Sequence, residues 1–321
     1  MSTAETTAAD IPLRRRASPR GAVWEPVFEG LCFGAATALL AALGGVLVSL
    51  GIGGWPAISK FGIGFLTSVE WDPNRDIYGA AGPIAGTLIT SALALLMALP
   101  VAGGVAFFLV ELCPPILRRP IGTAVELLAG IPSIVYGMWG LFVFAPFFAK
   151  WVELPAMAAA PSGTFWAGLV QGIPNGSGIL AASIILAIMI LPFMAATLRE
   201  LLNTVPPQVR ESAYGLGATT GEVVMKVTLP YVRRGAIGAV MLGLGRALGE
   251  TMAVTFIIGN AHGFPKGLFD AGSTIASTIA NEFNEASGLQ SAALIALGLV
   301  LFLITFIVLA LARLLLRTPK V

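Results

Sequence analysis

The chain has 321 residues, of which 56% are hydrophobic and only 11% are charged, and its mean hydropathy is +0.87. A chain with so few polar residues cannot cover the surface of a water-soluble domain. The composition therefore excludes a soluble globular protein and indicates an integral membrane protein. The net charge of +2 excludes no class of partner by itself.

Apolar segments predict the architecture. A membrane-spanning helix needs about 20 apolar residues to cross a hydrocarbon core of about 30 Å. The predicted fold is therefore an all-α membrane domain of six helices, at 28–50, 84–111, 121–148, 177–198, 234–259 and 290–315. We expect this domain to cover 28–316, with a cytoplasmic loop at 201–232 and tails at 1–27 and 317–321.

The basic residues predict the orientation. Most of the 19 Lys and Arg residues fall on one side if the chain crosses the membrane six times. Basic residues next to membrane helices favour the cytoplasmic side, so we expect both termini there. The residues on this side are Arg14, Arg15, Arg16, Arg20, Arg118, Arg119, Arg199, Arg210, Lys226, Arg233, Arg234, Arg313, Arg317 and Lys320.

The first residues, 1–27, are polar and contain prolines, which is typical of an unstructured tail that ends in a turn between Trp24 and Phe28. The apolar run behind this tail is too long for a signal peptide, so we expect it to remain as the first helix. The external segment 51–83 contains Gly-Gly-Trp-Pro and, at 71–74, Trp-Asp-Pro-Asn, which predict turns. Its tryptophans favour anchoring at the membrane interface over contact with an external partner.

Prolines and hydroxyls mark the second helix. Pro100 predicts a broken, kinked helix that packs against protein, because neighbours must satisfy the freed backbone groups. Its hydroxyl residues Thr87, Thr90 and Ser91 either line a polar path or bond to backbone carbonyls and a neighbouring helix. The second role is the more common one for hydroxyls in membrane helices.

The third helix is expected to begin after Pro120, which places Glu126 near its cytoplasmic start. There the helix dipole favours a carboxylate, so a structural role is predicted for Glu126. Pro132 predicts a second kink, and 150–176 is expected to be an external loop. Cys32 and Cys113 lie in or beside apolar spans and are expected to be buried small hydrophobes.

The last external loop covers 261–288. Its apolar residues Ile275, Ile279 and Phe283 follow helical spacing, which predicts a short amphipathic helix on the outer surface. The single histidine, His262, has no companion ligand in the sequence and is expected to be a solvated loop residue.

Helix-capping signals give the cytoplasmic loop a predicted structure. Pro206 and Pro207 can begin a helix, and Gly217 can end it in the left-handed conformation. Thr219 and Glu222 then have the spacing of a capping box for a second helix, which Pro230 is expected to end. Two capped helices between two spans predict a rigid element that is suited to passing mechanical force.

This loop resembles the EAA motif of ABC importer permeases, EAA-x3-G-x9-I-x-LP. Ser212 stands in place of one Ala and Val227 in place of Ile, and both are small changes. The resemblance implies that the loop docks into a cytoplasmic ATPase subunit. The residues that it assigns to this contact are Glu211, Ser212, Ala213, Gly217, Val227, Leu229 and Pro230.

Three further runs resemble the phosphate-specific PstC family of these permeases, at 126–137, 243–260 and 280–283, and the likeness extends over about 77–316. The PstA family shares an Arg-x-x-Gly-Glu-Thr core, but the continuation Met-Ala-Val-Thr-Phe-Ile-Ile-Gly-Asn fits PstC better. The resemblance implies a type I ABC importer permease of the bacterial plasma membrane that imports inorganic phosphate by ATP-driven alternating access. The implied partners are a PstA-like permease, a PstB-like ATPase dimer, a PstS-like phosphate-binding protein and membrane lipid, without nucleic acid or a cofactor.

An arginine is predicted inside the membrane. At about 1.5 Å per residue, Arg246 lies about 18 Å from Arg234, where insertion of an arginine costs about 2.5–3.5 kcal/mol. Glu250 is four residues further, so on a continuous helix it shares the face of Arg246 and can pair with it. Two interpretations stay open, a packing ion pair and an anion pathway in which Arg246 binds phosphate and Glu250 is the counter-charge.

Small residues on the same helical face leave room for an anion, although they also suit close helix packing. The face is expected to hold Ala239, Gly243, Ala253 and Ile257. Glu250 is further proposed to accept the proton of monohydrogen phosphate and so to disfavour sulfate.

Other function classes fit the sequence less well. It has no G-x-x-x-x-G-K-[ST] run, so we expect no nucleotide site of the P-loop type and ATP hydrolysis in a separate subunit. An intramembrane enzyme would need a nucleophile or a metal site, which Arg246 and Glu250 do not supply. A secondary anion transporter would usually show internal repeats with paired broken helices, and a sulfate or molybdate permease is the nearest alternative.

Overall fold

The computed structural model describes residues 24–161 and 163–316, and the side chains of 315 and 316 are not described. The expected tails therefore lie outside the described residues, apart from 24–27. The chain divides into two compact units, 1–49 and 50–321, and each is considered by itself.

Helix α1, Glu25–Phe61, begins in the first unit and ends in the second. It begins earlier than expected, so 25–27 are helical, and it continues through Pro56 past the predicted end at residue 50. In the first unit nearly all its side chains are exposed, Cys32 included, which suits a helix that meets lipid. The predicted turn at Gly-Gly-Trp-Pro is wrong, because the helix packs there through buried Gly54 and Ala57.

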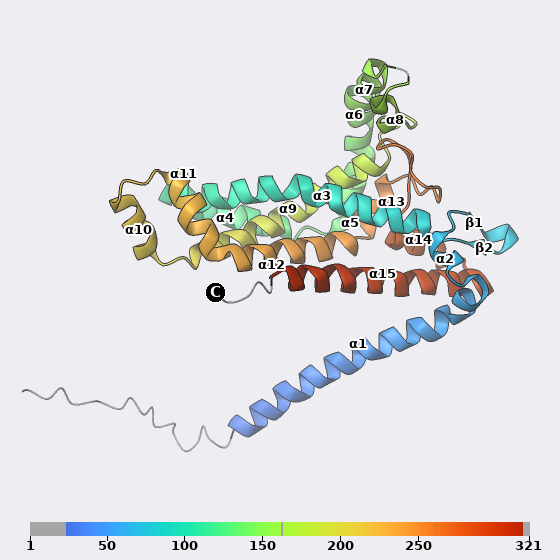
Figure 1. The fold of residues 1–321 in the computed structure, drawn as a ribbon, viewed down its shortest axis with the longest axis horizontal. Helices are drawn as coiled ribbons and strands as arrows, with labels where there is room; N and C mark the ends of the chain where they lie inside the picture. Colours follow the sequence, from blue (N-terminus) through green and yellow to red (C-terminus); the bar gives the residue numbers. More distant parts are fainter. Residues whose placement is uncertain (1–23, 162, 317–321) are drawn as a thin grey trace, which may run out of the picture. The chain divides into compact units, whose positions relative to one another are not determined.

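The core of the second unit is formed by α3 (Ala81–Phe107), α9 (Ile179–Asn203) and α12 (Leu229–Leu248), which run side by side (Figure 1). Small residues recur every four positions on the buried face of α3, which lets the backbones of α3 and α9 approach closely. These residues are Ala94, Ala98, Ala102 and Ala106.

Helix α3 runs through Pro100 without a break, so the predicted interruption is wrong. A membrane helix packed on its neighbours can tolerate the loss of one backbone donor. The irregularity lies later, in a π-helical segment at Phe108–Leu112 that ends before buried Cys113. Thr87 and Thr90 donate to the carbonyls of Pro83 and Gly86, both at 2.7 Å, which confirms the structural role of these hydroxyls.

The predicted third span is two helices, α4 (Pro115–Ala129) and α5 (Ser133–Trp139), because the chain turns at Gly130–Pro132. Figure 1 shows α4 along the bundle, whereas the following helices stand across it. Glu126 lies in the last turns of α4, so the helix-dipole argument for it is wrong. The segment expected as a loop after residue 150 continues in helical form, and it includes α6 (Ala145–Phe148), α7 (Leu154–Ala159) and α8 (Phe165–Leu169).

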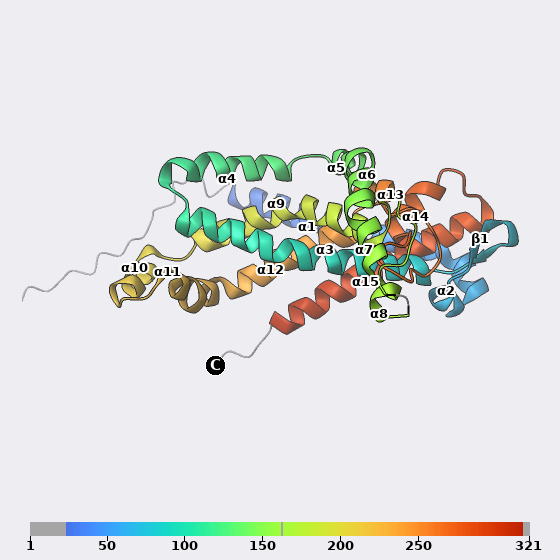
Figure 2. The same cartoon turned by 90° about the horizontal axis from the view of Figure 1, so that it is seen from above.

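At the other end of the bundle lie α2 (Gly64–Thr67), α13 (Met252–Ile257) and α14 (Ile275–Glu282), together with a hairpin of β1 (Trp71–Asp72) and β2 (Ile77–Tyr78) (Figure 2). The turn predicted at 71–74 is confirmed. Trp71 is buried, so it is no interface anchor. Helix α14 is also confirmed, but its first residues are buried among α3, α13 and α15 (Gly288–Leu316) and do not lie on the surface.

Among the residues that the structure describes, five helical segments are long and apolar enough to cross a membrane. Helix α12 is not among them, because it carries three arginines and ends at Leu248. The five segments are Glu25–Phe61, Ala81–Leu112, Ser133–Ala159, Ile179–Asn203 and Gly288–Leu314.

Candidate transport pathway and coupling loop

Arg246 lies in the last turn of α12 and is half-buried. Its guanidinium carbon is 5.6 Å from the ring centroid of Phe193 on α9, a distance at which a cation is attracted to an aromatic ring. Within the described part of the chain Arg246 forms no ion pair with a carboxylate. Its charge is therefore held beside an aromatic face and stays available to an anion.

A cavity of about 690 Å³ adjoins Arg246 between α9, α12 and α15. One wall is the glycine-rich face of α12, and Gly238 leaves open space where a side chain would stand. The lining residues are Thr197, Leu201, Gly235, Gly238, Ala239, Met241, Leu242, Gly245, Arg246, Leu309 and Arg313. The cavity therefore has mostly apolar walls and two arginines, half-buried Arg246 and exposed Arg313, whose positive charges suit an anion.

Glu250 does not pair with Arg246, so the predicted ion pair is wrong. The prediction assumed a continuous helix, but α12 ends at Leu248 and α13 starts at Met252. The Glu250 carboxylate instead accepts a hydrogen bond from the backbone N–H of Ala253 at 3.2 Å, so it satisfies a free donor at the start of α13.

The same break divides the predicted common face, so that Ala239 stays on α12 and lines the cavity with Arg246, whereas Ala253 and Ile257 lie on α13. Gly243 packs against Met194 of α9, and Ala253 and Ile257 are buried in α13, so these residues do not leave room for an anion. The open space lies beside Gly238, and Gly245 also lines the cavity, where a side chain would contact Leu309; neither glycine was predicted to lie on the pathway. Their spacing of seven residues on one helix was the available signal.

The cytoplasmic loop follows its capping signals closely. Helix α10, Pro207–Gly215, begins at Pro207, and Gly217 has a φ of +85°. Thr219 and Glu222 form the predicted capping box at the start of α11, Thr220–Glu222. The Lys226 ammonium, with the backbone N–H and hydroxyl of Thr219, lowers the pKa of the Glu222 carboxyl to about 2.

Pro230 does not end the second helix, so that expectation is wrong. A π-helical segment, Val223–Thr228, joins α11 to α12, and Pro230 takes an early position in α12. The helix tolerates the proline where its backbone hydrogen-bond ladder is already irregular, directly after the π-helical segment. The loop thus consists of α10 and one helix that continues directly into the bundle.

The motif residues of the loop divide between surface and interior. Ala213, Val227 and Leu229 are half-buried. Glu211, Ser212, Gly217 and Pro230 are exposed, and Leu216 beside them is 90% exposed. The exposed members are free to contact another protein.

An ion pair that sequence reasoning missed connects this loop to the bundle. Arg210 of α10 lies 3.3 Å from the carboxylate of Glu111 at the end of the α3 span, and both side chains are largely buried. Arg210 also donates to the carbonyl of Leu202 on α9. The sequence had suggested only an orienting role for Arg210, because nothing local indicates a partner so far away in the chain.

His262 is not a solvated loop residue. Its Nε2 lies 2.9 Å from the Glu282 carboxylate, and its ring stacks on Trp71 with centroids 5.5 Å apart. Trp71 and Gln290 donate to the same carboxylate at 3.0 and 2.9 Å. Burial by itself raises the pKa of Glu282, but the hydrogen bonds from His262, Gln290 and Trp71 outweigh it and hold this pKa below its ordinary value.

These features define a class of protein, a multi-pass membrane permease with an arginine-lined cavity and a capped cytoplasmic loop. Residues 108–320 match the family model described as "Binding-protein-dependent transport system inner membrane component". The chain thus has the domain of inner membrane subunits that work with a binding protein.

Curated relatives narrow the class. The chain is 54% identical to the PstC phosphate transport system permease protein of Mesorhizobium japonicum, over 92% of this chain and 90% of the relative. It is 55% identical to PstC of Pasteurella multocida over 85% of each, and 53% identical to PstC of Haemophilus influenzae over 85% of this chain and 86% of the relative. The chain belongs to the PstC family of phosphate transport system permease proteins.

Solved structures agree on the fold. A crystal structure of a bacterial ABC transporter involved in the import of alginate aligns with a TM-score of 0.56 at 17% identity, over 92% of this chain and 98% of that chain. The alginate ABC transporter in complex with its pentasaccharide-bound periplasmic protein gives a TM-score of 0.58 at 16% identity, over 92% and 99%. The fold is that of ABC importer permeases.

Proposed function

We propose that the chain is the permease subunit of an ATP-driven importer of inorganic phosphate. The observation that carries this proposal is the identity of 53–55% with permeases named for phosphate transport, over at least 85% of the chain. The site is chemically suitable, because Arg246 offers a planar fork of donors that matches phosphate oxygens.

The proposed assembly contains a PstA-like permease, a PstB-like ATPase dimer and a PstS-like phosphate-binding protein. The exposed motif residues Glu211, Ser212 and Gly217 are proposed to contact the ATPase, which supplies the energy that this chain does not generate. The ion pair between Arg210 and Glu111 supports this role, because it joins the contact surface directly to the bundle. In this assignment the end of the bundle with α10 and both termini are cytoplasmic in the bacterial plasma membrane.

Arg246 and Glu250 are proposed to act separately along the pathway. Since the Glu250 carboxylate bonds to α13, phosphate meets Arg246 without first displacing a paired carboxylate. Glu250 is half-buried at the break between α12 and α13. A movement of the end of α12 relative to α13 would therefore change the solvent exposure of the Glu250 carboxylate. Its proposed selectivity role is to accept the proton of monohydrogen phosphate, which sulfate lacks.

The test of the substrate is uptake of labelled phosphate, at limiting phosphate, in cells that lack this chain. Wild type restores uptake, and excess unlabelled sulfate or molybdate does not compete. Failure of wild type to restore phosphate uptake, or competition by excess sulfate or molybdate, would contradict the proposal. A Glu250→Gln variant that retains the full preference for phosphate over sulfate would remove only the selectivity role of Glu250.

A further inference from the structure

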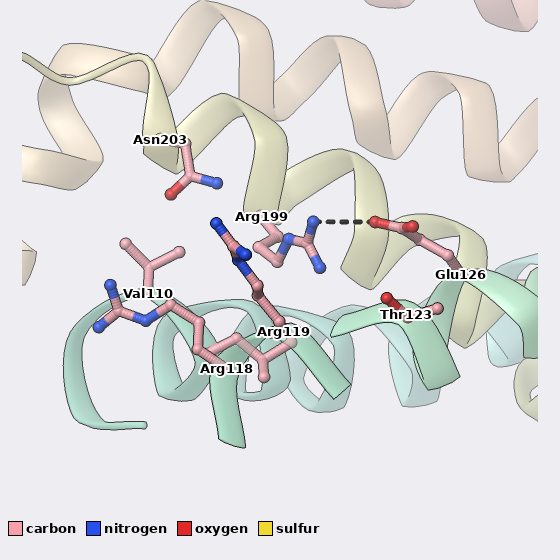
Figure 3. A pocket seen from close by; sticks show the side chains of 8 residues that line it. Val110, Arg118, Arg119, Thr123, Glu126, Arg199 and Asn203 are labelled. Carbon is pink, nitrogen blue, oxygen red and sulfur yellow. Dashed lines mark hydrogen bonds and ion pairs between the residues drawn. The ribbon is translucent and has the colours of Figure 1, made fainter. Parts of the chain in front are cut away.

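A second charged recess lies at the end of the bundle that carries α10 and α11. It encloses about 300 Å³ between α4, α9 and the π-helical segment that follows α3. Leu109 and Val110 form an apolar floor, and Figure 3 shows polar side chains of α4 and α9 around it. The lining residues are Leu109, Val110, Arg118, Arg119, Thr123, Glu126, Arg199 and Asn203, none of which lines the cavity beside Arg246.

The close approach of α4 to α9 fixes one of the three arginines. Gly122 is buried directly against the Arg199 guanidinium, and a Cβ at this position would collide with Nη1. Arg199 is held from the sides by Glu126 at 2.8 Å and Glu200 at 3.0 Å. Its guanidinium is therefore positioned at the wall of the recess.

The recess carries more positive than negative charge. Three arginines line it against the carboxylates of Glu126, which lines it, and Glu200, and both of these bond to Arg199, so the unbalanced positive charge is that of Arg118 and Arg119. Arg118 bonds back to the carbonyl of Cys113 at 3.4 Å. Arg119 rises towards Asn203 and Arg199 (Figure 3) and has no ion pair or side-chain hydrogen bond with any residue in the described ranges. A free guanidinium beside an amide and a hydroxyl is a donor set for an oxyanion.

The surroundings favour an anion that is attached to a lipid. Helix α4 exposes large apolar side chains on both sides of its arginine pair, and Ile116 is 87% exposed. The others are Leu117, Leu127 and Leu128. Basic recesses between membrane helices near the cytoplasmic surface suit anionic head groups, while neighbouring apolar side chains meet the acyl chains.

We infer that this recess binds a phosphate group, with Arg119 and Arg199 as the charged donors and Asn203 and Thr123 as neutral ones. The phosphate of an anionic phospholipid and free inorganic phosphate share this chemistry, and the apolar flanks of α4 favour the lipid. The inference is independent of phosphate transport, because it uses no residue of the proposed pathway.

The test is equilibrium binding of two probes to the purified full chain in neutral detergent. One probe is a fluorescent phosphatidylglycerol and the other is radiolabelled inorganic phosphate. Arg119→Gln is the main variant, because this exposed side chain has no described partner whose loss would disturb folding. Arg233→Gln is the matched control, since Arg233 is also exposed at this end of the bundle but does not line the recess.

We expect Arg119→Gln to weaken phosphatidylglycerol binding about fivefold, the effect of one arginine at an anionic lipid. Arg119→Lys should lose less, because it keeps the charge but not the fork. Arg233→Gln should bind as wild type does. If instead labelled phosphate binds and Arg119→Gln weakens that binding, the site stands and its ligand is the free anion. Unchanged binding of both probes in Arg119→Gln and in an Arg119→Gln, Arg199→Gln double variant would overturn the inference.

Discussion

The ion pair between Arg210 and Glu111 should carry force between the cytoplasmic loop and the bundle. The two groups are 3.3 Å apart, and their side chains are 17% and 8% exposed, so water screens the pair little. Removing one partner of a buried pair costs about 3–5 kcal/mol, because the other charge stays buried. For Glu111→Gln we expect the lower end, about 3 kcal/mol, since Arg210 keeps its bond to the Leu202 carbonyl.

Two measurements separate stability from coupling. Denaturant unfolding of the purified chain in detergent gives the loss in the free energy of unfolding. Phosphate transported per ATP hydrolysed, in the reconstituted assembly, should fall in Glu111→Gln because α10 is no longer tied to the α3 span. Lys226→Gln is the matched control, because it breaks an exposed pair with Glu222 in the same loop and should change both quantities little.

A charge-swapped variant, Glu111→Arg with Arg210→Glu, tests the pairing itself. It should recover part of the stability lost by Glu111→Gln if the two groups interact directly. If Glu111→Gln changes stability and coupling no more than Lys226→Gln does, the ion pair does not tie α10 to the α3 span.

Three smaller predictions concern the loop and the outer cluster. Gly217→Ala should lower the free energy of unfolding by about 1–2 kcal/mol and weaken ATPase binding, because the backbone φ is +85° there. Gly215→Ala is the control, because it also meets open space but has a helical backbone, and it should change neither quantity. Equal ATPase binding by both variants would exclude backbone strain at Gly217 as the cause. Thr219→Ala should lower the free energy of unfolding by about 1 kcal/mol, measured with denaturant, because the helix cap is lost. An unchanged free energy of unfolding would mean that the capping box does not stabilise the chain. Because the pKa of Glu282 is lowered in the folded state, its contribution to stability is present above the ordinary value of 4.5 and is lost as pH falls through the folded value. The thermal stability of Glu282→Gln should therefore not show this loss at acid pH. A pH profile of thermal stability that is the same as that of wild type would contradict this role of Glu282.

The loop shows why some of the site was predictable from sequence. Gly217 and the Thr219–Glu222 box act within a few residues, so the local sequence determines their geometry, and both are confirmed. Five of the six predicted apolar spans have a counterpart among the described helices, because a length of about 20 apolar residues is a local property, whereas the predicted span at 234–259 breaks after Leu248. Pro100 and Pro230 were misjudged because packing, which is not local, decides whether a helix continues through a proline.

The charged pairs show what the sequence could not reveal. The spacing of Arg246 and Glu250 predicted a pair only on a continuous helix, and the break at Gly249 turns Glu250 towards Ala253. His262 and Glu282 meet through tertiary folding, with Trp71 from a distant part of the chain. The one available signal was that both 243–260 and 280–283 resemble the PstC family, and this resemblance did not indicate that their residues Asn260 and Glu282 line one pocket with His262.

Phosphate is proposed to pass Arg246 on its way through the membrane. The most direct measurement is ATP-driven uptake of labelled phosphate into proteoliposomes that contain the complete assembly, with Arg246→Gln compared with Arg233→Gln on the same helix. Loss of a charge-assisted contact of about 1.5–3 kcal/mol predicts that Arg246→Gln lowers uptake about tenfold or more, while ATP hydrolysis and assembly continue. Equal uptake by the two variants would contradict the account and would leave Arg246 as a residue that packs against Phe193.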